Sequence, residues 1–328
     1  MSKLKLNVDQ VLKKYALSDL TRAEVVKILI LILDNSDNEK ERITSLKALG
    51  DVETCSSKCF ELLERLMVSD LDEKIRSLAV FLMGQKFLNR AFQLLKWMLK
   101  YEKSYITLVA TIKVLEKVAT EDSKQLILDK ISRIIKIHKK SFLNHYVSMI
   151  KELDNKIGLS NLTQTQLSSI LINLMTISNL SNLYPNFGYK ICKQSLTVYE
   201  LDLSDLELEP KGLPFGWINN IKNISDIEGL TNLKDLKYLD LSNNKIENVK
   251  DIVNLENLEY LNLSNNKIKD INEMKFINQL AKLRTLDLHG NQIVNDLSPK
   301  DVKFSLKVIS KTYFEEAEEV YEKYFIKN

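Results

Sequence analysis

One eleven-residue pattern occurs three times in the C-terminal part of the chain. It reads L-x-x-L-x-L-x-x-N-x-I and spans residues 236–246, 258–268 and 283–293. A repeat constrains the fold more than any other sequence feature, because each copy adopts the same local structure and buries its apolar side chains against its neighbours. We therefore expect this region to form a stack of similar coils.

The spacing within each copy predicts a short strand followed by a tight return. The isoleucines that end the pattern, together with Ile221 before them, are separated by 25, 22 and 25 residues. Between them apolar residues recur at every third position, as in Ile246, Val249 and Ile252. A period of roughly three residues per turn is typical of a 3-10 helix. Each coil is expected to contain a strand, a turn and a helical return of this kind.

An asparagine occupies the same position in all three copies, at Asn244, Asn266 and Asn291. We expect these side chains to point inward and to hydrogen-bond backbone groups of the turn, because a buried backbone group without a partner costs about 1–3 kcal/mol. A catalytic asparagine is the alternative interpretation, and no neighbouring residue supports it.

The two ends of the repeat are less regular. Residues 198–208 form a degenerate copy in which Leu206 stands where asparagine is expected. After the last copy, Ser298 and Pro299 are typical of a helix start, and apolar residues continue at helical spacing. We predict a helix over about residues 299–326 that covers the open end of the stack, since an uncapped end would expose apolar surface.

The 22-residue step with its full apolar pattern resembles the leucine-rich repeat subclass of the nuclear regulatory subunit of protein phosphatase-1, over about residues 198–298. The resemblance implies a right-handed β-α solenoid. It also implies binding of other proteins, although members of this subclass bind many unrelated partners.

The N-terminal part follows a helical period instead. Residues 38–50 and 72–84 look like copies of each other at a spacing of 34, from Arg42 to Arg76 and from Gly50 to Gly84. They resemble the second helix of HEAT-type repeats, which implies an α-α (HEAT/armadillo-like) superhelix in which the arginine pairs with an aspartate of a neighbouring repeat. An irregular helical bundle is the alternative. The predicted domains are residues 1–185 (helical repeats), 186–298 (leucine-rich repeats) and 299–328 (capping helix).

Composition and motifs favour no catalytic chemistry. With 47 basic and 44 acidic residues, the net charge of +3 gives no global argument for nucleic acid or a membrane. Phosphate-binding glycine loops and metalloprotease or hydrolase motifs do not occur. The cysteines, Cys55, Cys59 and Cys192, form neither a disulfide framework nor a metal-ligand set. We expect no catalytic residue, no metal and no cofactor, and a reducing cytoplasm as the location.

Alternation along the predicted strands directs three columns of side chains onto one face of the sheet. The first column contains tyrosines, the second is acidic, and the third is small and polar. Tyrosine is favoured at interface centres because it buries a large area and keeps a polar tip. The predicted partner-binding residues are Glu200, Asp202, Tyr238, Asp240, Tyr260, Asn262, Asp287 and His289. Solvated strand positions without a binding role are the alternative.

A second candidate surface is basic. Lys130, Arg133, Lys136 and Lys140 fall on one side of a predicted helix. They indicate either a solvated helix face or contact with an acidic partner, RNA or an anionic membrane. A run of glutamates follows near the C-terminus, between residues 315 and 322.

These features favour a non-enzymatic adaptor or scaffold for one or more proteins, with regulation of a partner enzyme as one role, over binding of a small-molecule substrate. An RNA or ribonucleoprotein assembly factor that uses the Lys130–Lys140 face is the alternative function. The oligomeric state stays open.

Overall fold

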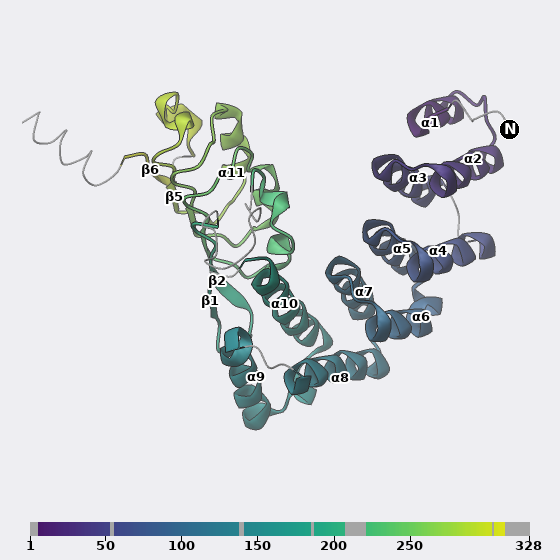
Figure 1. Cartoon of the computed structure of the whole chain (residues 1–328), viewed down its shortest axis with the longest axis horizontal. Coiled ribbons are helices and arrows are strands. Elements are labelled where there is room, and N and C mark those ends of the chain that lie inside the picture. The colour runs from purple at the N-terminus through teal and green to yellow at the C-terminus, as the bar shows by residue number, and fades with distance from the viewer. Residues whose placement is uncertain are drawn as a thin grey trace, which may run out of the picture. The chain divides into compact units, whose positions relative to one another are not determined.

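The computed structural model describes residues 6–52, 56–137, 141–184, 187–206, 221–303 and 305–311. The chain forms two compact units, shown as the helical and strand-containing parts of the ribbon in Figure 1. One comprises Met1–Ile137 with Gly158–Leu171, and the other comprises His138–Ile157 with Ile172–Asn328. The coarse prediction, helices followed by a repetitive strand-containing region, agrees with this order of elements.

The first unit is built from helical hairpins. Helices α2 and α3, α4 and α5, and α6 and α7 pack as pairs, and α3, α5 and α7 also contact one another in that order. Polar N-caps begin several of the helices, as at Thr21, Ser56 and Ser104. The elements are α1 (Val8–Ala16), α2 (Arg22–Asn35), α3 (Glu39–Val52), α4 (Ser57–Ser69), α5 (Glu73–Lys86), α6 (Leu88–Tyr101), α7 (Tyr105–Val118), α8 (Glu121–Ile137), a 3-10 turn (Leu159–Asn161) and the first part of α10 (Gln164–Leu183).

Two ion pairs repeat from hairpin to hairpin. Arg42 Nη2 lies 2.5 Å from Asp70 Oδ2, and Arg76 Nε lies 2.8 Å from Glu102 Oε2. Asp70 is the C-cap of α4, and Glu102 is the C-cap of α6. Each acidic residue therefore lies just before the second helix of its own hairpin, α5 or α7. All four side chains are at least four-fifths buried, so these pairs are shielded from water far better than surface pairs.

The glycines at the same spacing allow close packing. A Cβ added to Gly50 would lie 2.6 Å from Leu82 Cδ2, and one added to Gly84 would lie 2.6 Å from Val114 Cγ1. Such distances are too short for real contacts, so a side chain at either position would force its neighbour to move. Leu82 can change rotamer, whereas the β-branched Val114 offers little room at Gly84. The 34-residue spacing therefore repeats a contact between helices as well as a charge pair.

Replacing Glu102 by glutamine is expected to lower the free energy of unfolding by about 1–2 kcal/mol at pH 7, because a charge-assisted hydrogen bond becomes a neutral one. Burial alone would raise the pKa of the Glu102 carboxyl, but hydrogen bonds from Arg76, Ser104 and Lys103 outweigh burial and lower that pKa. A lowered folded-state pKa stabilises the protein above the unfolded-state value, and this stabilisation is lost as pH falls.

The difference between wild type and Glu102→Gln should therefore shrink as pH falls below about 4.5, the ordinary carboxyl value. Urea unfolding followed by circular dichroism from pH 7 to pH 3 measures it. Glu61→Gln, at an exposed position of α4, is the control. If the difference in the free energy of unfolding stayed constant with pH, the Glu102 carboxylate would not stabilise the fold through its charge.

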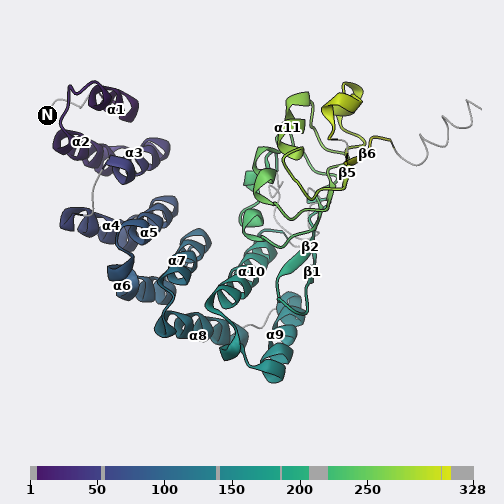
Figure 2. The ribbon, with the colours of Figure 1, turned by 180° about the vertical axis from the view of Figure 1, so that it is seen from behind.

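The second unit contains one six-stranded sheet in chain order. Strand β1 runs antiparallel to β2, and every later pair is parallel. The strands are β1 (Gly188–Ile191), β2 (Val198–Asp202), β3 (Tyr238–Asp240), β4 (Tyr260–Asn262), β5 (Thr285–Asp287) and β6 (Lys307–Ile309). Seen from behind in Figure 2, the returning segments lie on the side of each coil opposite the strands.

The returns are mostly 3-10 turns, as their three-residue period predicts. They comprise Ile224–Asp226, Leu230–Asn232, Lys250–Asn254, Ile271–Glu273, Gln292–Asn295 and Pro299–Asp301, with one short α-helix, α11 (Met274–Ile277). The apolar residues of the pattern are buried, including Leu239, Leu241, Ile246 and Val249 at 0% exposure. The repeating aliphatic positions therefore form one continuous core through the stack.

Each repeat asparagine links its own coil to the preceding one. Asn266 Nδ2 donates to the carbonyl oxygens of Leu263 (3.0 Å) and Leu241 (2.8 Å), and Asn266 Oδ1 accepts from the N–H of Ile246 (2.9 Å). Asn244 and Asn291 make the equivalent bonds in their coils. The amide thus satisfies donors and acceptors of two adjacent turns at once.

The residue before each of these asparagines has a positive φ. The angle is 55° at Asn243, 53° at Asn265 and 71° at Gly290. Asparagine and glycine tolerate this left-handed conformation better than other residues do. The backbone of the turn therefore explains why the pattern carries Asn-Asn twice and Gly-Asn once.

The first end of the sheet is closed by α9 (Asn144–Ile157), the later part of α10 and the 3-10 turn Ser141–Leu143. The hydroxyl of Tyr146 donates to the carbonyl of Leu196 (2.5 Å), and Asn173 Oδ1 accepts from the N–H of Val198 (2.9 Å). These buried contacts attach α9 and half of α10 to the strand-containing unit, although both were predicted to belong to the helical domain. Strand β1 was not predicted.

The other end differs from the prediction. The helix expected over residues 299–326 is wrong for residues 299–311, where the 3-10 turn Pro299–Asp301 is followed by β6. The N–H of Lys307 donates to the carbonyl of Arg284 (2.8 Å), and β6 pairs in parallel with β5. The start signals at Ser298 and Pro299 thus begin a single turn, and the chain then extends the sheet. Residues 312–328 lie outside the described part of the chain.

Candidate partner-binding surface

Four side chains form a row across the central strands. Glu200, Tyr238, Tyr260 and Thr285 are register partners from β2 to β5. The rings of Tyr238 and Tyr260 have centroids 6.5 Å apart, and Tyr199 approaches Tyr238 edge-on at 6.4 Å. Tyr238 is 41% exposed, so its ring is available to a partner. The repeat places these aromatic rings side by side because each strand pairs with the next without a register shift.

A shallow hollow of about 280 Å³ lies beside this row. Its lining includes five of the predicted binding residues: Glu200, Asp202, Tyr238, Asp240 and Tyr260. Leu201 and Leu239 complete the lining between them. Asn262 of β4 adjoins the hollow through its bond to Asp240 but does not line it, and Asp287 and His289 lie farther along the sheet. The predicted surface therefore divides into a hollow over β2–β4, with Asn262 at its margin, and a polar edge at Asp287 and His289.

The acidic column also has a structural role that was not predicted. Asp240 Oδ1 accepts from the N–H (2.8 Å) and hydroxyl (2.6 Å) of Ser242, and Asp240 Oδ2 accepts from Asn262 Nδ2 (2.9 Å). Asp202, Asn262 and Asp287 each accept from the N–H two residues later. These bonds close the end of each strand, as an Asx turn does. The sequence Asp/Asn-Leu-Ser/His, which recurs at the end of each strand, could have predicted these turn bonds.

The β5 end of the column is the most enclosed. Asp287 is only 8% exposed, and its Oδ1 lies 2.6 Å from Nδ1 of His289. Both side chains are therefore engaged with each other rather than directed at solvent. They contribute less to an open surface than their strand positions predict.

Charge in the hollow is unevenly compensated. Glu200 forms an ion pair with Lys190 at 2.8 Å. Asp202 and Asp240 form no ion pair with any described residue, and Asp202 is exposed. Burial raises the pKa of the Tyr260 phenol, and the charges of Asp287 and Asp240 raise it further. The hollow therefore presents tyrosine rings beside two carboxylates that form no ion pair with a described residue.

The basic face of α8 is less continuous than predicted. Lys130 is half-buried, its Nζ donates to the carbonyl of Leu99 (2.8 Å), and burial followed by the charge of Arg133 lowers its pKa. Arg133 and Lys136 are exposed, and Lys140 lies outside the described residues. Within the described chain, the stripe thus offers two exposed cations instead of four.

Other candidate chemistry is sparse. Cys59 is buried, Cys192 is half-exposed, and Cys55 lies outside the described residues. Among the described residues, no three histidine, cysteine or acidic side chains gather closely enough to hold a metal ion. In the same part of the chain, every helix is too short or too polar to cross a membrane.

Comparison with known families identifies repeats in the C-terminal part of the chain. Residues 217–268 match the family model described as Leucine rich repeat, and residues 256–301 match that described as Leucine Rich repeats (2 copies). No curated protein matches the chain. The region that carries the sheet therefore contains leucine-rich repeats, which are typically non-enzymatic modules that mediate protein–protein interaction.

Proposed function

We propose that this protein is a non-enzymatic adaptor that binds a basic segment of a protein partner in the hollow over β2–β4. The observation that carries the proposal is the position of two adjacent tyrosine rings, with centroids 6.5 Å apart, beside the carboxylates of Asp202 and Asp240, which form no ion pair with a described residue. An arginine side chain suits this arrangement, because its guanidinium stacks on aromatic rings and donates several hydrogen bonds to carboxylates.

We further propose that the repeats belong to the phosphatase-regulator subclass and that the helical hairpins are HEAT-like. The 22-residue step between Ile246 and Ile268 supports the phosphatase-regulator subclass of leucine-rich repeats, and hence regulation of a partner enzyme. The Arg42–Asp70 and Arg76–Glu102 pairs support a HEAT-like origin of the helical hairpins. Under this proposal the helical hairpins provide a second binding surface, so that the adaptor contacts more than one protein.

The charge requirement can be tested with Asp202→Asn and Asp240→Asn together. Asparagine already stands at the equivalent position of β4, Asn262, and its Oδ1 accepts the same backbone bond. The double variant should therefore keep its strand-end turns and lose two negative charges, while the bond from Asn262 Nδ2 to Asp240 Oδ2 is lost. Its melting temperature is measured beside that of wild type to show that the fold is kept. Affinity for a basic partner is expected to fall about tenfold at low salt, and the difference should narrow as salt rises.

The measurement starts with affinity capture from the native cell by the full chain. The recovered proteins are identified by mass spectrometry and titrated against both forms. Asp235→Asn with Asp296→Asn is the matched control, since both residues are exposed and the charge change is identical. A partner that binds the Asp202→Asn/Asp240→Asn variant and wild type equally well would contradict the proposed site.

A further inference from the structure

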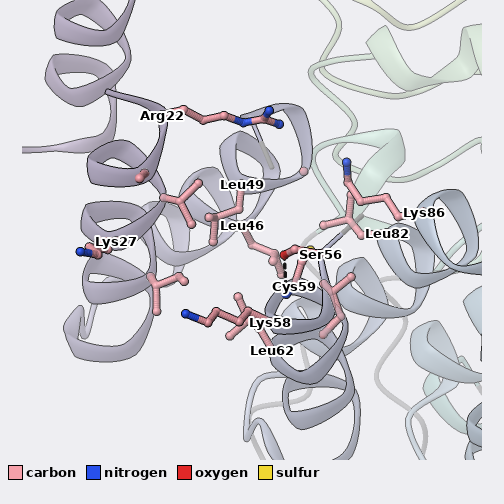
Figure 3. A pocket seen from close by; sticks show the side chains of 15 residues that line it. Arg22, Lys27, Leu46, Leu49, Ser56, Lys58, Cys59, Leu62, Leu82 and Lys86 are labelled. Atoms are coloured by element: carbon pink, nitrogen blue, oxygen red, sulfur yellow. Dashed lines mark hydrogen bonds between the residues drawn. The ribbon is translucent and has the colours of Figure 1, made fainter. Parts of the chain in front are cut away.

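A second groove lies in the helical unit, between the α2–α3 hairpin and the α4–α5 hairpin (Figure 3). Its volume is about 480 Å³, larger than that of the hollow over β2–β4. The floor is aliphatic and includes Leu46, Leu49, Leu63 and Leu82. Along the mouth, Val26 and Ile30 of α2 face this space and are only half-buried. The groove therefore offers an apolar strip between two helices.

Every charged residue that lines this groove is basic. The four are Arg22, Lys27, Lys58 and Lys86, and Figure 3 shows them around the aliphatic floor. The Arg22 side chain is held by its Nε, which donates to the carbonyl of Val52 (2.7 Å). Lys27 and Lys58 are exposed and have no ion pair or hydrogen bond with any described residue. The rim thus carries two exposed lysines, Lys27 and Lys58, that form no ion pair within the described hairpins.

Some cations elsewhere in the same hairpins are paired. Arg65 pairs with Asp34 at 2.8 Å and Lys74 pairs with Glu39 at 2.6 Å, in addition to the two buried arginine pairs. Lys27 and Lys58, like Lys40 and Lys47 of α3, have no ion pair with a described residue, but of these four only Lys27 and Lys58 line the aliphatic groove. An occupant that matches this surface combines an apolar side with several negative charges.

The chain itself contains a segment with this chemistry. Residues 312–328 include five glutamates between positions 315 and 322. Apolar and aromatic residues recur in the same segment at helical spacing, at Tyr313, Ala317, Val320, Tyr321 and Tyr324. A helix of this length would extend about 25 Å. The pattern predicts an amphipathic element whose acidic face and apolar face are both suited to the groove.

We infer that the groove of one copy binds residues 312–328 of a second copy. Groove and segment belong to different compact units, so their pairing joins unlike surfaces of two chains. A heterologous contact of this kind links copies head to tail and makes assembly depend on protein concentration. The aliphatic floor supplies the contact area, and the lysine–glutamate pairs supply the direction and the salt dependence.

The test uses the full chain and a fluorescein-labelled peptide of residues 312–328. Fluorescence anisotropy should give a micromolar dissociation constant that weakens as salt rises. Lys27→Glu with Lys58→Glu should weaken peptide binding about tenfold or more, because like charges then face each other. Arg133→Glu with Lys136→Glu, which makes the same charge change on exposed positions of α8, should change it less than about twofold. A peptide with Val320, Tyr321 and Tyr324 replaced by serine should not bind.

Sedimentation velocity over a wide concentration range completes the test. The full chain should self-associate with increasing concentration, and the free peptide should reverse the association. Equal weakening by the two charge-reversed pairs would overturn the proposal, since the attraction would then be non-specific. A chain that stays monomeric would overturn it too. So would a groove that binds phosphatidylserine vesicles through Lys27 and Lys58 but not the peptide.

Discussion

Replacement of Asn266 by leucine is expected to lower the free energy of unfolding of the repeat stack by about 3 kcal/mol or more. Leucine has a similar volume, so little packing is lost, but it cannot replace the amide bonds. The N–H of Ile246 would be left without its amide partner in a buried turn, and the carbonyls of Leu241 and Leu263 would each lose one of two amide donors, keeping those of Asn244 and Asn291. An unpaired buried N–H costs about 1–3 kcal/mol, and each lost hydrogen bond costs about 1 kcal/mol more.

Urea unfolding gives the overall effect, and hydrogen exchange followed by mass spectrometry locates it. Protection should fall most in peptides that cover residues 236–268, the coils on both sides of the missing bonds. Asn295→Leu is the matched control, because Asn295 is exposed on a returning turn and has no hydrogen bond from its side chain to a described residue. Similar unfolding of the two variants would show that the Asn266 amide does not hold the coils together.

Replacement of both Tyr238 and Tyr260 by alanine is expected to reduce partner affinity about 100-fold or more. Buried aromatic anchors each contribute roughly 2 kcal/mol or more at interface centres, and these two rings form the apolar wall of the hollow. The fold should be unaffected, because Tyr238 is exposed and Tyr260 is half-buried above leucines that stay in place. Titration of the captured partner against the purified variant measures the loss.

Tyr15→Ala with Tyr101→Ala provides the comparison, since both are exposed tyrosines of the helical unit. That variant should bind the partner of the hollow as wild type does. If the Tyr238/Tyr260 variant keeps its melting temperature and its full affinity, the partner binds elsewhere.

The central coils could be predicted from the sequence because their determinants are local and repeated. Leu239 and Leu261 are register partners, and the buried aliphatic residues follow at the predicted three-residue period. Tyr238 and Tyr260 could be placed side by side for the same reason, since identical spacing in consecutive copies leaves only one register.

The ends of the sheet depend on contacts that no local pattern records. Strand β1 exists because residues 188–191 pair back onto β2, and α9 joins this region through Tyr146, which bonds a carbonyl 50 residues later. At the other end, β6 completes hydrogen bonds along β5, and this requirement overrides the helical spacing after Pro299. Lys130 likewise donates a hydrogen bond to the carbonyl of Leu99 on a different helix, and the spacing of the lysines along α8 could not predict that bond.

The asparagine bridges have an evolutionary consequence. Each one connects a coil only to the coil before it, so the sheet behaves as a linear series of nearest-neighbour joints. A duplication or loss of one whole unit of 22 or 25 residues preserves every remaining link between coils, whereas a shorter insertion within a strand breaks one. Related sequences can therefore gain or lose whole strands of the sheet, including those that carry a tyrosine, while the remaining coils keep their structure.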